Sequence, residues 1–216
     1  MEVQFYFIIL FFLVILGLIF FSFYFEKKRT QQLEQLMKLQ GFSFQKEGDQ
    51  NILNEQFKLF SVGHSHRVYN LSTGTRSHFN LKIFDYKYTV GGGKNSHTYN
   101  QTAIIVESKN QLPDFSLSTE SFFHKIGDLF GFKDIDFVDY PNFSKMYLLK
   151  GSNEDSIRKL FRPEVLQYLE QNKTNATIEA SGNKILYYES GKRTKPQEMT
   201  QFIEKAITTL NLFLRD

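Results

Sequence analysis

The chain opens with a long apolar run, and the residues after it alternate between polar and apolar with the periods typical of helices and strands. Residues 3–25 contain only Gln4 and Ser22 as strongly polar side chains. A helix over these residues is about 34 Å long, which is enough to cross a hydrocarbon layer of about 30 Å. The run therefore predicts a transmembrane anchor over residues 1–26, with the lipid bilayer as its partner through residues 3–25.

Two other interpretations of this run are a cleaved signal peptide and a buried helix of a soluble protein. Signal peptides combine a basic start, about 7 to 15 apolar residues and a small-residue cleavage site. Here Glu2 is the only charge before a longer run, and Tyr24, Phe25 and Glu26 at its end do not form such a site. A helix that is apolar on every side needs a larger protein to enclose it. Both alternatives fit the sequence less well than a span.

The basic residues beside the run predict its orientation. Lys27, Lys28 and Arg29 follow the run directly, and no Lys or Arg precedes it. Because basic residues are retained on the cytoplasmic side, we expect the N-terminus outside and the C-terminal domain in the cytoplasm. The sequence thus predicts a single-pass protein of the inner or plasma membrane.

The stretch after the span predicts a stalk and then a β-rich subdomain. Residues 27–41 continue the helix as a juxtamembrane stalk, and residues 42–110 form the β-rich subdomain. Within it, residues 79–107 predict one long antiparallel hairpin with a glycine-rich turn. The apolar parity changes along its first strand, which indicates a strand that is buried on both faces or contains a bulge. Residues 51–60 have the spacing of a short helix.

Residues 111–216 predict an α+β subdomain. A helix capped by Ser118 comes first, and two ββα units follow. The first unit has strands around residues 135–137 and 145–150 with a turn at Pro141; the second has strands at 177–180 and 184–189. The predicted fold class is therefore α+β, an N-terminal transmembrane helix followed by antiparallel sheet with helices packed on one face.

Charge and cysteine content limit the classes of partner. All 26 basic residues follow the span, and only Glu2 of the 23 acidic residues precedes it, so the remaining chain has a small basic excess. That excess is far from the dense basic stripe of a nucleic-acid-binding protein, and we expect no nucleic-acid partner. Without cysteine the chain forms no disulfide and has no thiolate metal ligand. A second basic cluster at residues 192–195 fits either lipid contact or a solvated loop.

Candidate catalytic residues form no complete pattern. The glycines before Lys94 lack the spacing and the following helix of a phosphate-binding loop. Asp134 and Asp136 alternate with apolar residues, and with His64 or His66 they suggest a metal-dependent hydrolase as the alternative function. Alternation of this kind is equally typical of a half-buried strand. We therefore assign no catalytic, cofactor-binding or metal-ligating residue and expect a binding module more than an enzyme.

Tyrosines along the hairpin suggest a binding surface. Tyr86, Tyr88 and Tyr99 are interleaved with polar residues, and Lys94 lies in the turn between them. Such a face can stack against a ligand or a protein partner at the membrane. The alternative is that it packs against a helix, as tyrosine-rich sheet faces usually do.

Four segments resemble a family of bacterial single-pass membrane-anchored proteins without an established activity. They are FDYKYTVGGGKNSHTYNQT at residues 84–102, LPDFSLSTE at 112–120, DIDF at 134–137 and YLLKG at 147–151. The resemblance implies that the glycine-rich hairpin belongs to the fold, and it supplies no catalytic residues. Together these observations predict a membrane-anchored, cytoplasm-facing domain that acts as a non-catalytic binding or scaffolding module.

Overall fold

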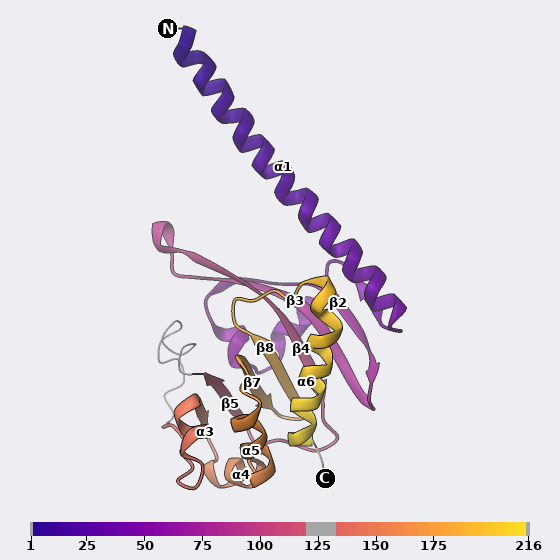
Figure 1. The fold of residues 1–216 in the computed structure, drawn as a ribbon, viewed down its shortest axis with the longest axis vertical. Helices are drawn as coiled ribbons and strands as arrows, with labels where there is room; N and C mark the ends of the chain where they lie inside the picture. Colours follow the sequence, from indigo (N-terminus) through magenta and orange to yellow (C-terminus); the bar gives the residue numbers. More distant parts are fainter. Residues whose placement is uncertain (1, 120–132, 215–216) are drawn as a thin grey trace.

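A long helix leads into a sheet that carries shorter helices (Figure 1). The computed structural model describes residues 2–119 and 133–214. Helix α1, Glu2–Leu39, is continuous and contains the predicted span and the predicted stalk as far as Leu39. Between Ile9 and Leu39 it is long and apolar enough to cross a membrane. The chain then turns at Gly41, whose φ of 82° lies in the left-handed region that glycine adopts without strain.

The strands form one eight-stranded antiparallel sheet in the order β1-β2-β3-β4-β8-β7-β5-β6. In chain order the strands are β1 Ser43–Gln45, β2 His64–Arg76, β3 Phe79–Val90, β4 His97–Glu107, β5 Phe115–Thr119, β6 Tyr147–Gly151, β7 Ala176–Ser181 and β8 Lys184–Glu189. Strands from both predicted subdomains belong to this sheet, because β4 pairs with β8. With its helices the sheet confirms the predicted α+β class.

The predicted long hairpin is confirmed as β3 and β4. Their register is continuous from the pair Leu81 and Val106 to the pair Val90 and His97. The change of apolar parity arises because the middle of β3 is buried on both faces, with Ile83 in one core cluster and Phe84 in the other. The register shifts occur in β2 instead, in its pairing with β3.

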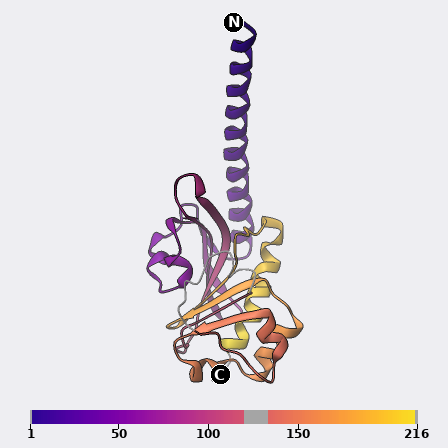
Figure 2. The same cartoon turned by 90° about the vertical axis from the view of Figure 1, so that its left-hand side faces the viewer.

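Each face of the sheet has its own cover (Figures 1 and 2). The first face packs against helices and the lower end of α1. Those helices are α3 Pro141–Met146, α4 Glu154–Leu160, α5 Pro163–Gln171 and α6 Met199–Leu214. The second face packs against two 3-10 helices, η1 Gln50–Asn54 and η2 Lys58–Ser61, where the sequence predicted one short helix. Two further 3-10 turns are η3 Gly93–Asn95 and η4 Pro196–Glu198.

The first predicted ββα unit differs from the structure. Residues 135–137 form no strand, because Asp134 replaces a backbone partner and accepts a hydrogen bond from the Leu149 N–H at 2.9 Å. Pro141 begins helix α3 and does not form a turn, since proline suits the first helical position. The second unit, β7, β8 and α6, has the predicted order.

The predicted helix that begins near Ser118 is wrong at its start. Ser118 lies in β5 and pairs with Leu148 of β6, so it does not cap a helix. The remainder of that predicted helix, residues 120–130, lies outside the described residues.

Candidate functional site

The lower end of α1 is built into the sheet domain. Leu33 and Met37 are buried in the first core cluster, on one side of the helix. One turn above Leu33, Arg29 points at β3 and donates to the Asp85 carboxylate from Nε at 3.2 Å and from Nη2 at 3.0 and 3.1 Å. The lower end of α1 is therefore part of the domain, and the predicted span continues from it in the same helix.

Asp85 is the shared hydrogen-bond acceptor of this junction. Its carboxylate also accepts hydrogen bonds from Asn70 Nδ2 at 3.0 Å and from Thr102 Oγ1 at 2.8 Å. Arg29 in turn donates from Nη1 to the Thr194 carbonyl at 2.7 Å. The Asp85 side chain is 1% exposed and that of Arg29 is 10% exposed, so both charges are largely removed from water. A buried charge is tolerated only when it is paired and hydrogen-bonded, as it is here.

A second ion pair joins the loop before α6 to the helix just below the span. Arg193 donates from Nη2 to Glu26 Oε1 at 2.6 Å and from Nη1 to Oε2 at 2.8 Å. Arg193 Nη1 also donates to the Tyr69 hydroxyl at 3.2 Å. Together with the Arg29 and Asp85 pair, this contact holds α1 against both β3 and the loop, which fixes the direction in which the span leaves the domain.

The basic residues predicted beside the membrane take different roles. Lys27 and Lys28 are exposed, whereas Arg29 is turned inward to Asp85. Sequence reasoning placed all three at the membrane surface and missed Asp85, because the two partners lie 56 positions apart. The available signal was Asp85 itself, the one acidic residue of this strand, between Phe84 and Tyr86.

The predicted tyrosine surface is largely internal. Tyr86 and Tyr88 are 0% exposed, because the segment containing η1 and η2 covers their face. Tyr86 donates to the Leu59 carbonyl at 3.4 Å and pairs with His66 Nδ1 at 2.6 Å. Burial raises the pKa of both tyrosines, so they stay neutral phenols. A partner cannot reach these two side chains in this conformation.

The accessible part of that surface lies near the hairpin tip. Lys94 is exposed, and Tyr99 is half-buried at the end of a stack that continues through Tyr88 at 5.2 Å between ring centroids. Beside Tyr99 is a polar cavity of about 490 Å³, which Asn100, Glu189 and other polar residues line. Binding at Lys94 and Tyr99 stays a prediction.

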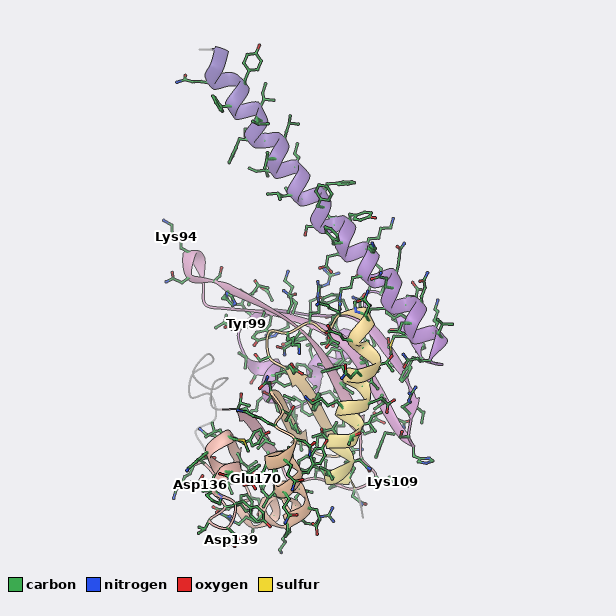
Figure 3. All side chains as sticks on the ribbon, in the orientation of Figure 1. Lys94, Tyr99, Lys109, Asp136, Asp139 and Glu170 are labelled. Carbon is green, nitrogen blue, oxygen red and sulfur yellow. The ribbon has the colours of Figure 1, made fainter. Side chains whose placement is uncertain are left out.

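The residues suggested for a metal-dependent hydrolase lie at opposite ends of the domain. His64 Nε2 is 2.9 Å from the Gly91 carbonyl, next to the tip that carries Lys94. Asp136 lies at the far end of the domain in Figure 3. The Asp134 carboxylate accepts a hydrogen bond from the Leu149 N–H, and burial raises the pKa of Asp134. Among residues 2–119 and 133–214, no group of three or more His, Asp or Glu side chains has an arrangement that would hold a metal ion.

Glu179 on β7 is a buried carboxyl group that sequence reasoning did not select. It is 2% exposed and accepts hydrogen bonds from the Tyr188 hydroxyl at 2.9 Å and from the Leu59 N–H at 3.2 Å. Burial raises its pKa even though these hydrogen bonds favour the charged form. Because Leu59 belongs to η2, this hydrogen bond links the 3-10 helix that covers the second face to strand β7 of the sheet. An acidic residue inside an apolar strand was the signal in the sequence.

Comparison with known proteins identifies a similar fold. No protein-family model matches the chain, and no curated protein matches its sequence. The chain is similar to the crystal structure of the mycobacterial trehalose monomycolate transport factor A, TtfA, with a TM-score of 0.62 and 11% sequence identity. The match covers 86% of this chain and 94% of that chain. At this identity the likeness shows the fold alone.

Proposed function

We propose that this protein is a bitopic membrane protein whose α+β domain faces the cytoplasm and acts as a non-catalytic binding or scaffolding module. The observation that carries the proposal is the junction of α1 with the sheet. A flexible tether would suffice to keep an enzyme near a membrane. Here the buried Arg29 and Asp85 pair and the Arg193 and Glu26 pair set the orientation of the whole domain relative to the span. A fixed orientation matters when one defined face must meet a partner at the membrane.

The chemistry of the domain supports binding over turnover. The carboxyl groups with raised pKa, Asp134 and Glu179, are each used in hydrogen bonds that hold the fold. The structural neighbour is named a transport factor, and the shared fold is consistent with a membrane-associated module. We also propose membership of the bacterial single-pass family, on the sequence segments shared with it.

The partner is proposed to bind at the polar cavity beside Tyr99. Thr98 and Asn175 stand on two walls of this cavity and are exposed. A photo-crosslinking amino acid placed at either position in the full-length chain should give one discrete protein adduct in native membranes. The same residue at Lys109, which Figure 3 places at the far end of the domain, is the matched control. Adducts that are absent at both cavity positions, or equal at all three, would refute a partner at this face.

The absence of cysteine makes the topology directly testable. A single Cys at Lys109 adds one reactive thiol at an exposed position. If the domain is cytoplasmic, an impermeant maleimide labels this variant only after the cells are permeabilised, and carbonate washing leaves the chain in the membrane. Labelling of intact cells would reverse the orientation, and release by carbonate would exclude the span.

A further inference from the structure

The tip of the β3 and β4 hairpin extends beyond the rest of the sheet. The pairing of β4 with β8 covers only Ala103 to Glu107, whereas its pairing with β3 continues to His97. Figures 1 and 2 show the hairpin rising on the side of the domain from which the span leaves. Apart from α1 itself, the tip reaches furthest toward the N-terminal half of α1. It therefore lies on the membrane side of the domain.

The position of the tip is fixed relative to the span. Asp85, which receives Arg29 of α1, belongs to β3, the same strand that ends at Val90 in the tip. A change in the tilt of α1 thus moves the hairpin with it. The fold therefore sets the position of the tip relative to the bilayer, unlike that of a loop that moves freely.

The tip has the composition of a headgroup contact. Residues 91–97 are all exposed, and none has an aliphatic or phenyl side chain that would enter hydrocarbon. Gly92 has no atom within 4 Å of its Cβ position, so the backbone here is open to a ligand. Lys94 forms no ion pair with any residue in the described ranges and can offer its ammonium to a phosphate. Small polar residues with one cation favour the interface over the bilayer core.

Most other cations near the exit of the span are neutralised. Lys192 pairs with Glu189 at 2.7 Å, Lys195 lies 3.7 Å from Glu198, and Arg193 is held by Glu26. Each basic residue of the cluster at residues 192–195 therefore has an acidic partner. Lys27 and Lys28 are exposed, and no ion pair to them is found among the residues that the structure describes. Exposed cations without an ion pair to a described residue are thus present at the helix exit and at the hairpin tip.

We propose that the hairpin tip, with Lys94 at its centre, is a second membrane contact that binds anionic lipid headgroups of the leaflet beside Lys27 and Lys28. The inference rests on the span of the proposed function and not on a protein partner. A lysine close to an anionic surface contributes about 1 kcal/mol, so its removal should lower the ratio of contacting to free tips about fivefold.

The test uses the full-length chain with one fluorophore on Ser96→Cys, which leaves Lys94 intact. The protein is reconstituted into liposomes of phosphatidylcholine alone or with phosphatidylglycerol, each containing a phosphatidylcholine with a spin label on its headgroup as quencher. Lys109→Cys, at the opposite end of the domain, is the matched control (Figure 3). Flotation of every sample with the liposomes establishes that the span is inserted, which separates this test from failure of the anchor.

We expect strong quenching at position 96 in anionic liposomes, weak quenching at 109, and about a fivefold loss of contact at 96 when Lys94→Gln is added. The tip contains no buried residue, so Lys94→Gln leaves the fold unchanged. Quenching at 96 that is no stronger than at 109 in floated samples would overturn the contact. Equal quenching with and without phosphatidylglycerol, or no effect of Lys94→Gln, would overturn the recognition of anionic headgroups by Lys94.

Discussion

Replacing Asp85 with Asn removes one charge from the junction while keeping the size of the side chain. The carboxylate accepts from two nitrogens of Arg29, from Asn70 and from Thr102. Asn has one acceptor oxygen and a donor amide, so part of these bonds is lost and the Arg29 guanidinium faces another donor. Its positive charge remains in a site where the side chain is 10% exposed.

Breaking a buried ion pair by removing one partner costs about 3 to 5 kcal/mol. Arg29 keeps its bond to the Thr194 carbonyl and retains some contact with solvent, which favours the lower end, about 3 kcal/mol. For a domain of this size about 1 kcal/mol corresponds to about 2 to 4 °C, so the Asp85→Asn variant should melt about 6 to 12 °C below the wild type.

Thermal unfolding of the full-length protein in detergent micelles, followed by near-ultraviolet circular dichroism of the tyrosine-rich core, measures this shift. Arg67→Met is the matched control, because the Arg67 and Glu47 side chains are 61% and 72% exposed and their pair should contribute less than about 1 kcal/mol. The double variant Arg29→Met with Asp85→Leu removes both charges and should lose less than the sum of the two single changes.

Two outcomes would refute this reasoning. A melting temperature of Asp85→Asn within 2 °C of Arg67→Met would mean, given the roughly 2 to 4 °C per kcal/mol expected here, that the junction adds no more than a surface pair. Strict additivity in the double variant would mean that Arg29 and Asp85 do not stabilise the domain through each other.

Three further predictions concern the core and the turns. The pKa of Glu179 is raised above its ordinary value of 4.5, so the folded state binds this proton more tightly than the unfolded state. Stability should therefore fall as pH rises above about 4.5, and Glu179→Gln should flatten that decline when the free energy of unfolding is measured by chemical denaturation at several pH values. An equal decline in the wild type and the variant would contradict this prediction. Tyr88→Ala should cost about 3 to 5 kcal/mol by leaving a cavity, whereas Tyr99→Ala should cost far less, and equal melting temperatures would place Tyr88 outside the core. Gly63→Ala should destabilise the protein by about 1 kcal/mol or more, because Gly63 has a φ of 74° and an added Cβ would meet the Thr89 carbonyl. Gly92→Ala is the control, because Gly92 has an extended backbone and open space around its Cβ position. An unchanged stability of Gly63→Ala would disprove the close approach.

Local pattern was sufficient for the features that depend on neighbours in the chain. An apolar run over residues 3–25 cannot be enclosed by the domain that follows, so the sequence alone predicts a helix able to span a membrane. Alternation over residues 79–107 likewise predicts the hairpin, because strand parity is a local property. The strand expected at residues 135–137 failed for a non-local reason, since Asp134 bonds the backbone of β6 in place of a ladder partner.

Only the tertiary structure decided which of these residues a partner can reach. A period of two shows that Tyr86 and Tyr88 share a face, but not that η1 and η2 cover it. Arg29 follows the span like its neighbours Lys27 and Lys28, yet it turns inward because Asp85, 56 positions away, offers it a buried carboxylate. Sequence determines the periodicity of a segment and its affinity for lipid, whereas burial and charge pairing depend on distant residues that only folding brings together.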